Sequence, residues 1–237
     1  MILHKDTYLN IVTLVSLLIY ATFIPLAIMN KVYGWIPDVI GFAILTIGFY
    51  LTYSYWRMNL PIFTIIIIGL LLHLGGIFGW YYISPVPIQW DHLTHFFGCL
   101  PFALLFFQFL KHKLNNKFFT VHNFLFFIII FFAAMGVGAL VELSEFWGYL
   151  SFGFGPGALM FGPGDGVIGK QGIELIDVLG GGWINKGWDM TFNLLGILVG
   201  MIVMMIIHFG FKLGREKKIT VQTSDYGTTE YDYSVKL

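Results

Sequence analysis

Three short stretches of the sequence place acidic residues within otherwise apolar segments, and two of the three also hold histidine or asparagine. WDHLTHFFG, residues 90–98, holds Asp91, His92 and His95, and the other two are VELSEFW at 141–147 and WDMTFN at 188–193. Imidazole and carboxylate groups are common protein ligands of Zn, Fe and Mn. A metal held by them can polarise a phosphoryl or carbonyl oxygen, or activate a bound water. These residue types therefore predict a polar site with a divalent transition metal.

Helical spacing predicts that each stretch presents its polar side chains on one face. At 100° per residue, a shared face is expected for three pairs: Asp91 with His95, Glu142 with Glu145, and Asp189 with Asn193. No Lys or Arg is expected at the same helix ends, and clustered carboxylates without a cation take up protons, stay hydrated or bind metal. We predict Asp91, His92, His95 and Glu142 as metal ligands, Glu145 and Asp189 as catalytic residues, and Asn193 as a further polar residue of the site.

Simpler structural roles remain open for these side chains. Asp91 and Asp189 each precede an apolar run, where an aspartate is often only the N-cap of a helix. Histidine and glutamate near a membrane surface can also lie in headgroup water. Capping does not account for Glu142 and Glu145, which are expected near a helix C-terminus, where the helix dipole disfavours carboxylates.

The elements that must position these residues are membrane-spanning helices. The chain has 237 residues, of which 57% are hydrophobic and 11% charged, and its mean hydropathy is +0.80. Apolar runs of about 20 residues are long enough to cross a bilayer. They predict an all-α, polytopic transmembrane bundle of about six spans: 8–29, 36–56, 61–82, 92–110, 123–147 and 190–211. A β-barrel is not expected, because the apolar runs do not alternate.

Charge distribution predicts how this bundle is oriented. With six spans, ten of the 13 Lys and Arg residues lie on the side of the two termini, and positively charged loops stay in the cytoplasm. Both termini are therefore expected to be cytoplasmic, with the polar site near the outer membrane face. We predict one transmembrane domain over 1–212, containing a glycine-rich extracytoplasmic loop at 148–188, and a polar cytoplasmic tail at 213–237.

Further polar residues lie in this loop and in the third span. Residues 148–187 include 13 glycines together with Asp165 and Asp177, and the segment could be a lid over the site or simply a surface loop. His73 lies inside the third span, where it could bond to a neighbouring helix or serve as a wall or proton relay of the site. We include Asp165, Asp177 and His73 in the predicted polar site.

Several motifs resemble those of the YjdF-type family of prokaryotic inner-membrane proteins. They are HLGG at 73–76, DHLTHFFG at 91–98, ELSEFW at 142–147, GDG at 164–166 and DMTFNLLG at 189–196. A more distant similarity is to VanZ-like membrane proteins. The family's GD element lies closer to its DM helix than Asp165 does here, so Asp177 could take its place. The resemblance implies a multi-pass protein of a prokaryotic cytoplasmic membrane and carries no established reaction.

Three classes of function are compatible with these patterns. The first is a membrane-embedded, metal-dependent enzyme acting on a lipid-linked or small amphiphilic substrate. The second is a transporter or proton-coupled permease, and the third is a structural or partner-binding membrane protein. Transporters usually hold their polar residues near the midplane, in repeated halves, whereas these residues are expected at one face. The net charge of zero gives no support for nucleic-acid binding.

Overall fold

The structure, a computed structural model, describes residues 2–82, 89–152 and 181–210. Its long helices are α1 (Ile2–Met29), α2 (Ile36–Leu51), α3 (Leu60–His73), α4 (Trp90–Leu110), α5 (Val121–Phe152) and α7 (Gly181–Met205). Short 3-10 segments follow at η1 (Tyr33–Trp35), η2 (Leu74–Phe78), η3 (Trp80–Tyr82) and η4 (Lys111–Lys113), and α7 ends in the π-helical turn η6 (Ile206–Gly210). The described residues contain no β-strand.

Six helices within these described residues are long and apolar enough to cross a membrane, which confirms the predicted all-α bundle of about six spans. The second span is shorter than predicted, because α2 ends at Leu51 and a turn with Arg57 at φ 50° leads into α3. α3 begins with Asn59 as its N-cap, whose side chain accepts a hydrogen bond from Ile62 N at 3.0 Å. The helices α5 and α7 extend into the range 148–188 that was predicted as a loop.

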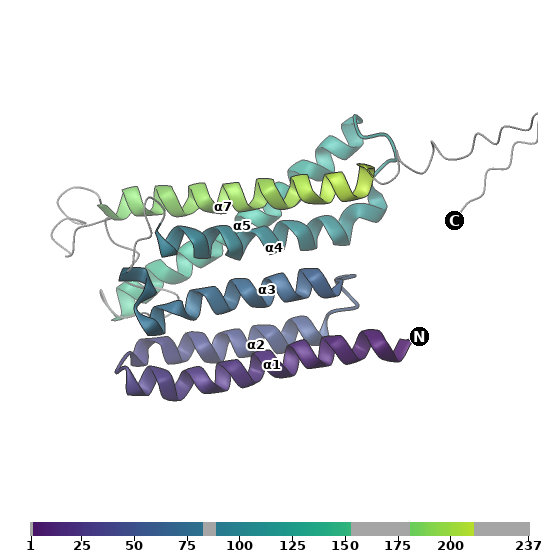
Figure 1. Cartoon of the computed structure of the whole chain (residues 1–237). Helices are drawn as coiled ribbons and strands as arrows, with labels where there is room; N and C mark the ends of the chain where they lie inside the picture. The colour runs from purple at the N-terminus through teal and green to yellow at the C-terminus, as the bar shows by residue number, and fades with distance from the viewer. Residues whose placement is uncertain (1, 83–88, 153–180, 211–237) are drawn as a thin grey trace, which may run out of the picture.

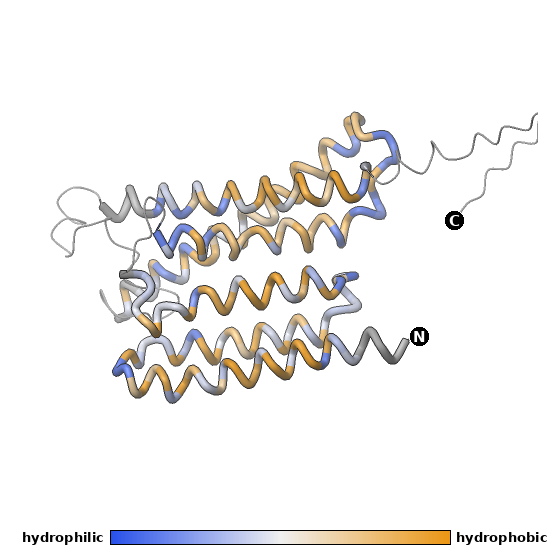
Figure 2. The backbone as a smooth tube through the Cα atoms, in the orientation of Figure 1, coloured by the Kyte–Doolittle hydropathy of each residue, from blue (hydrophilic) through white to orange (hydrophobic). Residues whose placement is uncertain are grey.

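The helices lie side by side, and α4 lies between α3 and α7 (Figure 1). α4 packs most extensively against α7, and also against α3 and α5, while α1 packs mainly against α2. The N-terminal end of α1 and the final turn of α7 lie at the same end of the bundle. Figure 2 shows the helices as predominantly hydrophobic along their length, with hydrophilic residues gathered toward their ends. This is the pattern that a bilayer requires of helices that cross it.

Small residues allow α4 and α7 to approach closely. A Cβ atom at Gly196 would overlap the carbonyl oxygen of Phe96, and one at Gly200 would lie 2.8 Å from the carbonyl oxygen of Leu100. Backbone carbonyls cannot rotate away as a flexible side chain can. The glycines therefore fix the separation of the two helices that carry most of the polar site.

Gly196→Ala is expected to destabilise the protein by about 1–3 kcal/mol, because the helices must separate to admit the methyl group. Gly136→Ala is the matched control, since a Cβ at Gly136 of α5 meets nothing within 4 Å. Thermal unfolding in detergent checks the pair. Equal melting temperatures for the two variants would show that close approach at Gly196 is unimportant.

Candidate metal site

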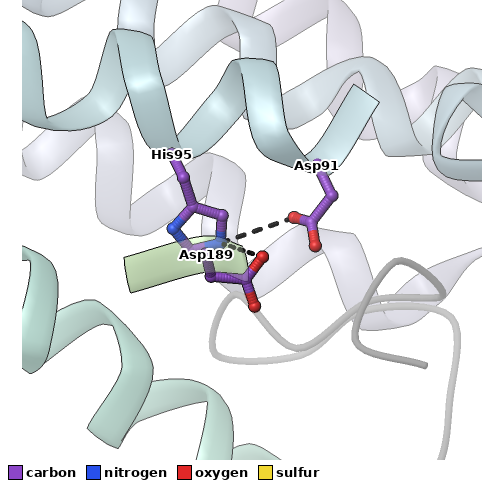
Figure 3. A group of neighbouring side chains, drawn as sticks. All are labelled: Asp91, His95 and Asp189. Atoms are coloured by element: carbon purple, nitrogen blue, oxygen red, sulfur yellow. Dashed lines mark ion pairs between the residues drawn. The ribbon is translucent and has the colours of Figure 1, made fainter. Parts of the chain in front are cut away.

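His95 of α4 is the centre of the polar site, because carboxylates from three helices converge on its imidazole ring. Nε2 of His95 lies 3.5 Å from Asp91 Oδ1 and 3.7 Å from Asp189 Oδ1, and Figure 3 shows both carboxylates directed at that nitrogen. Glu145 Oε1 is 3.9 Å from the same nitrogen, and Glu142 Oε1 is 3.5 Å from Nδ1. All five side chains are buried. The structure thus brings together acidic residues from α4, α5 and α7.

Two overlapping groups in this cluster could hold a metal ion. One consists of Asp91, His95 and Asp189, and the other of His95, Glu142 and Glu145. The separations of 3.5–3.9 Å exceed those of a direct hydrogen bond to nitrogen, which are about 2.7–3.2 Å. Two ligands of one tetrahedral metal, each about 2.0–2.2 Å from it, are roughly 3.4 Å apart. In the first group, the distances of 3.5 Å and 3.7 Å from His95 to Asp91 and Asp189 are therefore close to those between two ligands of one metal.

Asn193 lies beside Nδ1 of His95, the ring nitrogen that does not face Asp91 and Asp189. Its Oδ1 lies 3.3 Å from Nδ1 of His95 and accepts a hydrogen bond from Cys99 Sγ at 3.0 Å. An amide oxygen can only accept, so Nδ1 carries the proton when it bonds to Asn193. Neutral His95 then has an unprotonated Nε2 pointing toward Asp91 and Asp189. Such an outer hydrogen bond is the usual support of a metal-binding histidine.

His92 lies outside both groups, although it was predicted as a ligand. Its ring stacks on Phe192 with centroids 4.5 Å apart and an interplanar angle of 7°. Its Nδ1 accepts a hydrogen bond from the backbone N–H of Gln89 at 3.4 Å, as one half of a capping box at the start of α4. Through these contacts, His92 helps to cap α4 and to pack it against α7. Its predicted role as a ligand stays a prediction.

Helix boundaries exclude the simple capping alternatives for the acidic residues. The N-cap of α4 is Gln89, so Asp91 is inside the first turn. α7 begins at Gly181, which places Asp189 well within the helix and completely buried. The expected dipole effect on Glu142 and Glu145 does not apply, because α5 continues to Phe152 and the effect is confined to the last turn.

Lys186 is part of the cluster, which corrects the expectation that no basic residue lies at these helix ends. Its Nζ is 2.5 Å from Glu142 Oε2 and donates a hydrogen bond of 2.9 Å to Glu145 Oε2. Lys186 was predicted to lie in a loop, whereas α7 already includes it, three residues before Asp189. Residues three apart share a helical face, so this spacing would have indicated that Lys186 joins the cluster if the start of the helix had been known.

Lys186→Met is expected to raise the affinity for a divalent cation about tenfold, because a positive charge next to the ligands is removed. The metal-free variant should also be less stable, since two buried glutamates lose their shared cation. Titration of the chelator-treated protein with Zn²⁺ or Mn²⁺ measures the affinity. Lys31→Met, at an exposed lysine beyond α1, is the control. Unchanged affinity in Lys186→Met would place the metal away from this cluster.

A second polar group surrounds His73. Its Nε2 is 3.4 Å from Asp38 Oδ2 of α2, and its Nδ1 is hydrogen-bonded to the Tyr81 hydroxyl at 2.8 Å. The Tyr81 hydroxyl also lies 3.5 Å from Thr94 Oγ1, which donates to the backbone carbonyl of Asp91 at 2.7 Å. His73 is thus held on both ring nitrogens and connected to the first turn of α4. Asp38 was not predicted as a site residue. It could have been noticed in the sequence because it is an acidic residue in the first turn of a span.

A cavity of about 90 Å³ lies between these two polar groups. Its polar lining includes His73 from the second group, and His95, Glu145 and Asn193 from the first, together with Thr94. The remaining lining residues are glycine, apolar or sulfur-containing side chains. Asp91, Glu142 and Asp189 do not line it. Glu145 is therefore the carboxylate of the His95 cluster that borders the cavity.

The predicted site residues Asp165 and Asp177 lie outside the described residues, as does most of the glycine-rich segment predicted as a lid. The cytoplasmic tail predicted at 213–237 lies outside them as well.

The six spans and the buried histidine and carboxylate cluster define a multi-pass helical membrane protein with an internal polar site. The chain belongs to the DUF2238 family of predicted membrane proteins, whose family model matches residues 11–210. This match covers all of the residues that form the His95 and His73 groups. No curated protein and no solved structure matches the chain.

Proposed function

We propose that this protein is a membrane-embedded, metal-dependent enzyme that acts on a lipid-linked or small amphiphilic substrate. The observation that supports this most directly is the position of His95, which contacts the candidate metal ligands and also borders the cavity. A metal there would act as a Lewis acid toward a phosphoryl or carbonyl oxygen. The ligands suit Zn, Fe or Mn.

Charge balance favours a cation at this place. Four carboxylates are gathered around His95, and within the described part of the chain Lys186 brings one positive charge to them, with His95 adding a second when protonated. An excess of buried negative charge over nearby positive charge costs free energy, and a bound cation lowers that cost. Because Lys186 already pairs with Glu142 and Glu145, we assign the metal to the other group, Asp91, His95 and Asp189.

Different roles follow for the two residues predicted as catalytic. Glu145 borders the cavity and is held by Lys186, so it is positioned to accept a proton from a bound water or from the substrate. Asp189 is completely buried and does not border the cavity. We therefore propose Asp189 as a metal ligand and retain Glu145 as the general base.

The proposed function also requires a membrane and an orientation in it, and we take both from the sequence. We propose that the protein lies in the cytoplasmic membrane of a prokaryote, with both termini inside and the His95 cluster near the outer face. The described N-terminal helix and the final turn of α7 at one end of the bundle are compatible with that arrangement. The similarity of the motifs to YjdF-type and VanZ-like proteins supports a prokaryotic membrane.

Incubation of the purified, metal-loaded protein with a lipid extract tests the proposal. Mass spectrometry should show one lipid class consumed and a product of altered polar group formed, and both changes should stop after chelation. Reloading the metal should restore them. Absence of turnover in extracts from several prokaryotes, by protein shown to hold metal, would contradict an enzymatic role.

A transporter is the second candidate, because His73 and Glu145 border the same cavity and both could exchange protons. Both residues lie toward one end of the bundle, however, and the cavity lining deeper in the bundle is apolar. Flux of a substrate into liposomes that depends on His73 and Glu145, without chemical change of that substrate, would favour transport over catalysis.

A further inference from the structure

The cavity is lined mainly by one face each of α3, α4 and α5, to which α2 adds Phe42 and α7 adds Asn193. On α3 the lining residues include Ile66, Leu70 and His73, spaced by four and three residues. This spacing keeps them on one helical face. α5 contributes Val137, Val141 and Glu145 at the same kind of spacing, and α4 contributes six of the residues from 94 to 102. The cavity therefore extends along the helices and is not a pocket between side chains at a single level.

Polarity changes along this cavity from one end to the other. α3 and α5 reach the polar end at their later residues, His73 and Glu145, whereas α4 reaches it at an earlier residue, His95. The residues farther from that end are apolar on all three helices, such as Ile66, Phe102 and Val137. Seven residues separate His73 from Ile66 and His95 from Phe102, which is roughly 10 Å along a helix. The cavity is thus polar at one end and apolar at the other, as an amphiphilic molecule is.

The wall formed by α4 is open at Gly98. A Cβ atom at Gly98 would meet nothing within 4 Å, although this glycine lines the cavity. Gly69 on α3 also lines the cavity, but a Cβ there would lie 2.7 Å from the carbonyl oxygen of Phe97, so it serves helix packing. Among the described helices, α3 and α5 both pack on α4 without forming a substantial contact with each other. The surface of α4 at Gly98 therefore lies in a gap between its two neighbours.

We propose that this cavity binds the hydrocarbon chain of a single-chain membrane amphiphile, which enters sideways from the bilayer between α3 and α5. The chain lies over Gly98 against Ile66 and Phe102, and the polar group lies between His73 and the pair His95 and Glu145. A volume of about 90 Å³ corresponds to roughly six to nine water-sized positions, which suits a short length of one chain. The inference rests on the proposed function for its substrate, and it narrows that substrate to a single-chain amphiphile.

Photo-labelling with a 16-carbon alcohol that carries a diazirine at mid-chain tests the proposal. The full-length protein is placed in lipid nanodiscs, labelled, digested and mapped by mass spectrometry. Saturable labelling is expected on α3, α4 and α5 at the cavity, with competition by unlabelled 16-carbon alcohol. Labelling that is no greater there than on the lipid-exposed surfaces of α1 and α2, and is not saturable, would overturn the proposal.

Variants that fill the cavity distinguish labelling inside it from labelling on the general protein surface. Gly98→Leu fills the open space and should lower the cavity labelling at least fivefold, and Val137→Phe should do the same from the opposite helix. Gly136→Leu is the control, because a Cβ at Gly136 is equally unobstructed and this residue does not line the cavity. If Gly98→Leu does not fold, Val137→Phe decides the result. Full labelling in a folded blocking variant would overturn the proposed site.

The alcohol probe is uncharged, so its binding does not require a metal. Labelling is therefore repeated after chelation and in Asp91→Asn, and it should persist in both. Loss of metal binding with retained labelling would contradict only the proposed metal-dependent chemistry. Retained metal with no saturable labelling would contradict only the amphiphile site.

Discussion

Replacing His95 with alanine is expected to lower the affinity for a divalent metal at least a hundredfold. His95 is common to both candidate ligand groups, and its Nε2 faces two carboxylates within 3.7 Å. Loss of an outer hydrogen-bonding partner alone typically reduces metal affinity about 10–100-fold, and loss of a ligand should exceed that. Elemental analysis after purification without chelators, followed by titration with Zn²⁺ and Mn²⁺, measures the change.

His122→Ala is the matched control for this prediction. His122 lies at the start of α5, is exposed, and bonds to the backbone carbonyl of Lys113 at 2.8 Å. Its replacement changes the number of histidines without touching the His95 cluster, so metal content should stay that of the wild type. Equal metal content in His95→Ala and the wild type would exclude His95 as a ligand.

Glu145→Gln is expected to lower kcat by about 10²–10⁴-fold while leaving the metal bound, because the amide cannot accept a proton as a general base does. The substitution keeps the size of the side chain and an oxygen that can accept the hydrogen bond from Lys186, which is 2.9 Å long in the structure. Turnover of the lipid identified by the extract assay, measured together with metal content, separates a catalytic effect from a loss of metal.

Glu142→Gln is the control, since Glu142 also pairs with Lys186 but does not border the cavity. Its effect on kcat should be much smaller than that of Glu145→Gln. Comparable losses in both variants would indicate that the two glutamates act only by fixing Lys186. Full activity in Glu145→Gln would reject this residue as the base.

Local sequence patterns predicted the membrane spans well, for a physical reason. A helix in lipid must satisfy its own backbone hydrogen bonds and present apolar side chains, so its presence depends largely on the composition of about 20 consecutive residues. The ends are less constrained. α7 includes Lys186, which composition alone assigned to a loop, and this error concealed the cation that pairs with Glu142 and Glu145.

The convergence of α4, α5 and α7 at one end of the bundle was also predicted, because alternating spans bring alternate helix ends to one side. Periodicity placed Asp91 and His95 on one face, and the structure has their side chains 3.5 Å apart. The same reasoning placed His92 near that face, and its role as a ligand stays a prediction. The structure adds that its ring stacks on Phe192 of α7, a contact between residues that are far apart in the chain.

The sequence by itself determined that the described part of this protein has six helices long and apolar enough to cross a membrane, with acidic residues and histidine within them, since both properties follow from residue types along the chain. The tertiary structure decided which of those residues meet. Asp38 of α2 faces His73, Lys186 joins two glutamates of α5, and Glu145 borders the cavity where Glu142 does not. Such contacts depend on the rotation and separation of packed helices, which are fixed by close approaches such as that at Gly196.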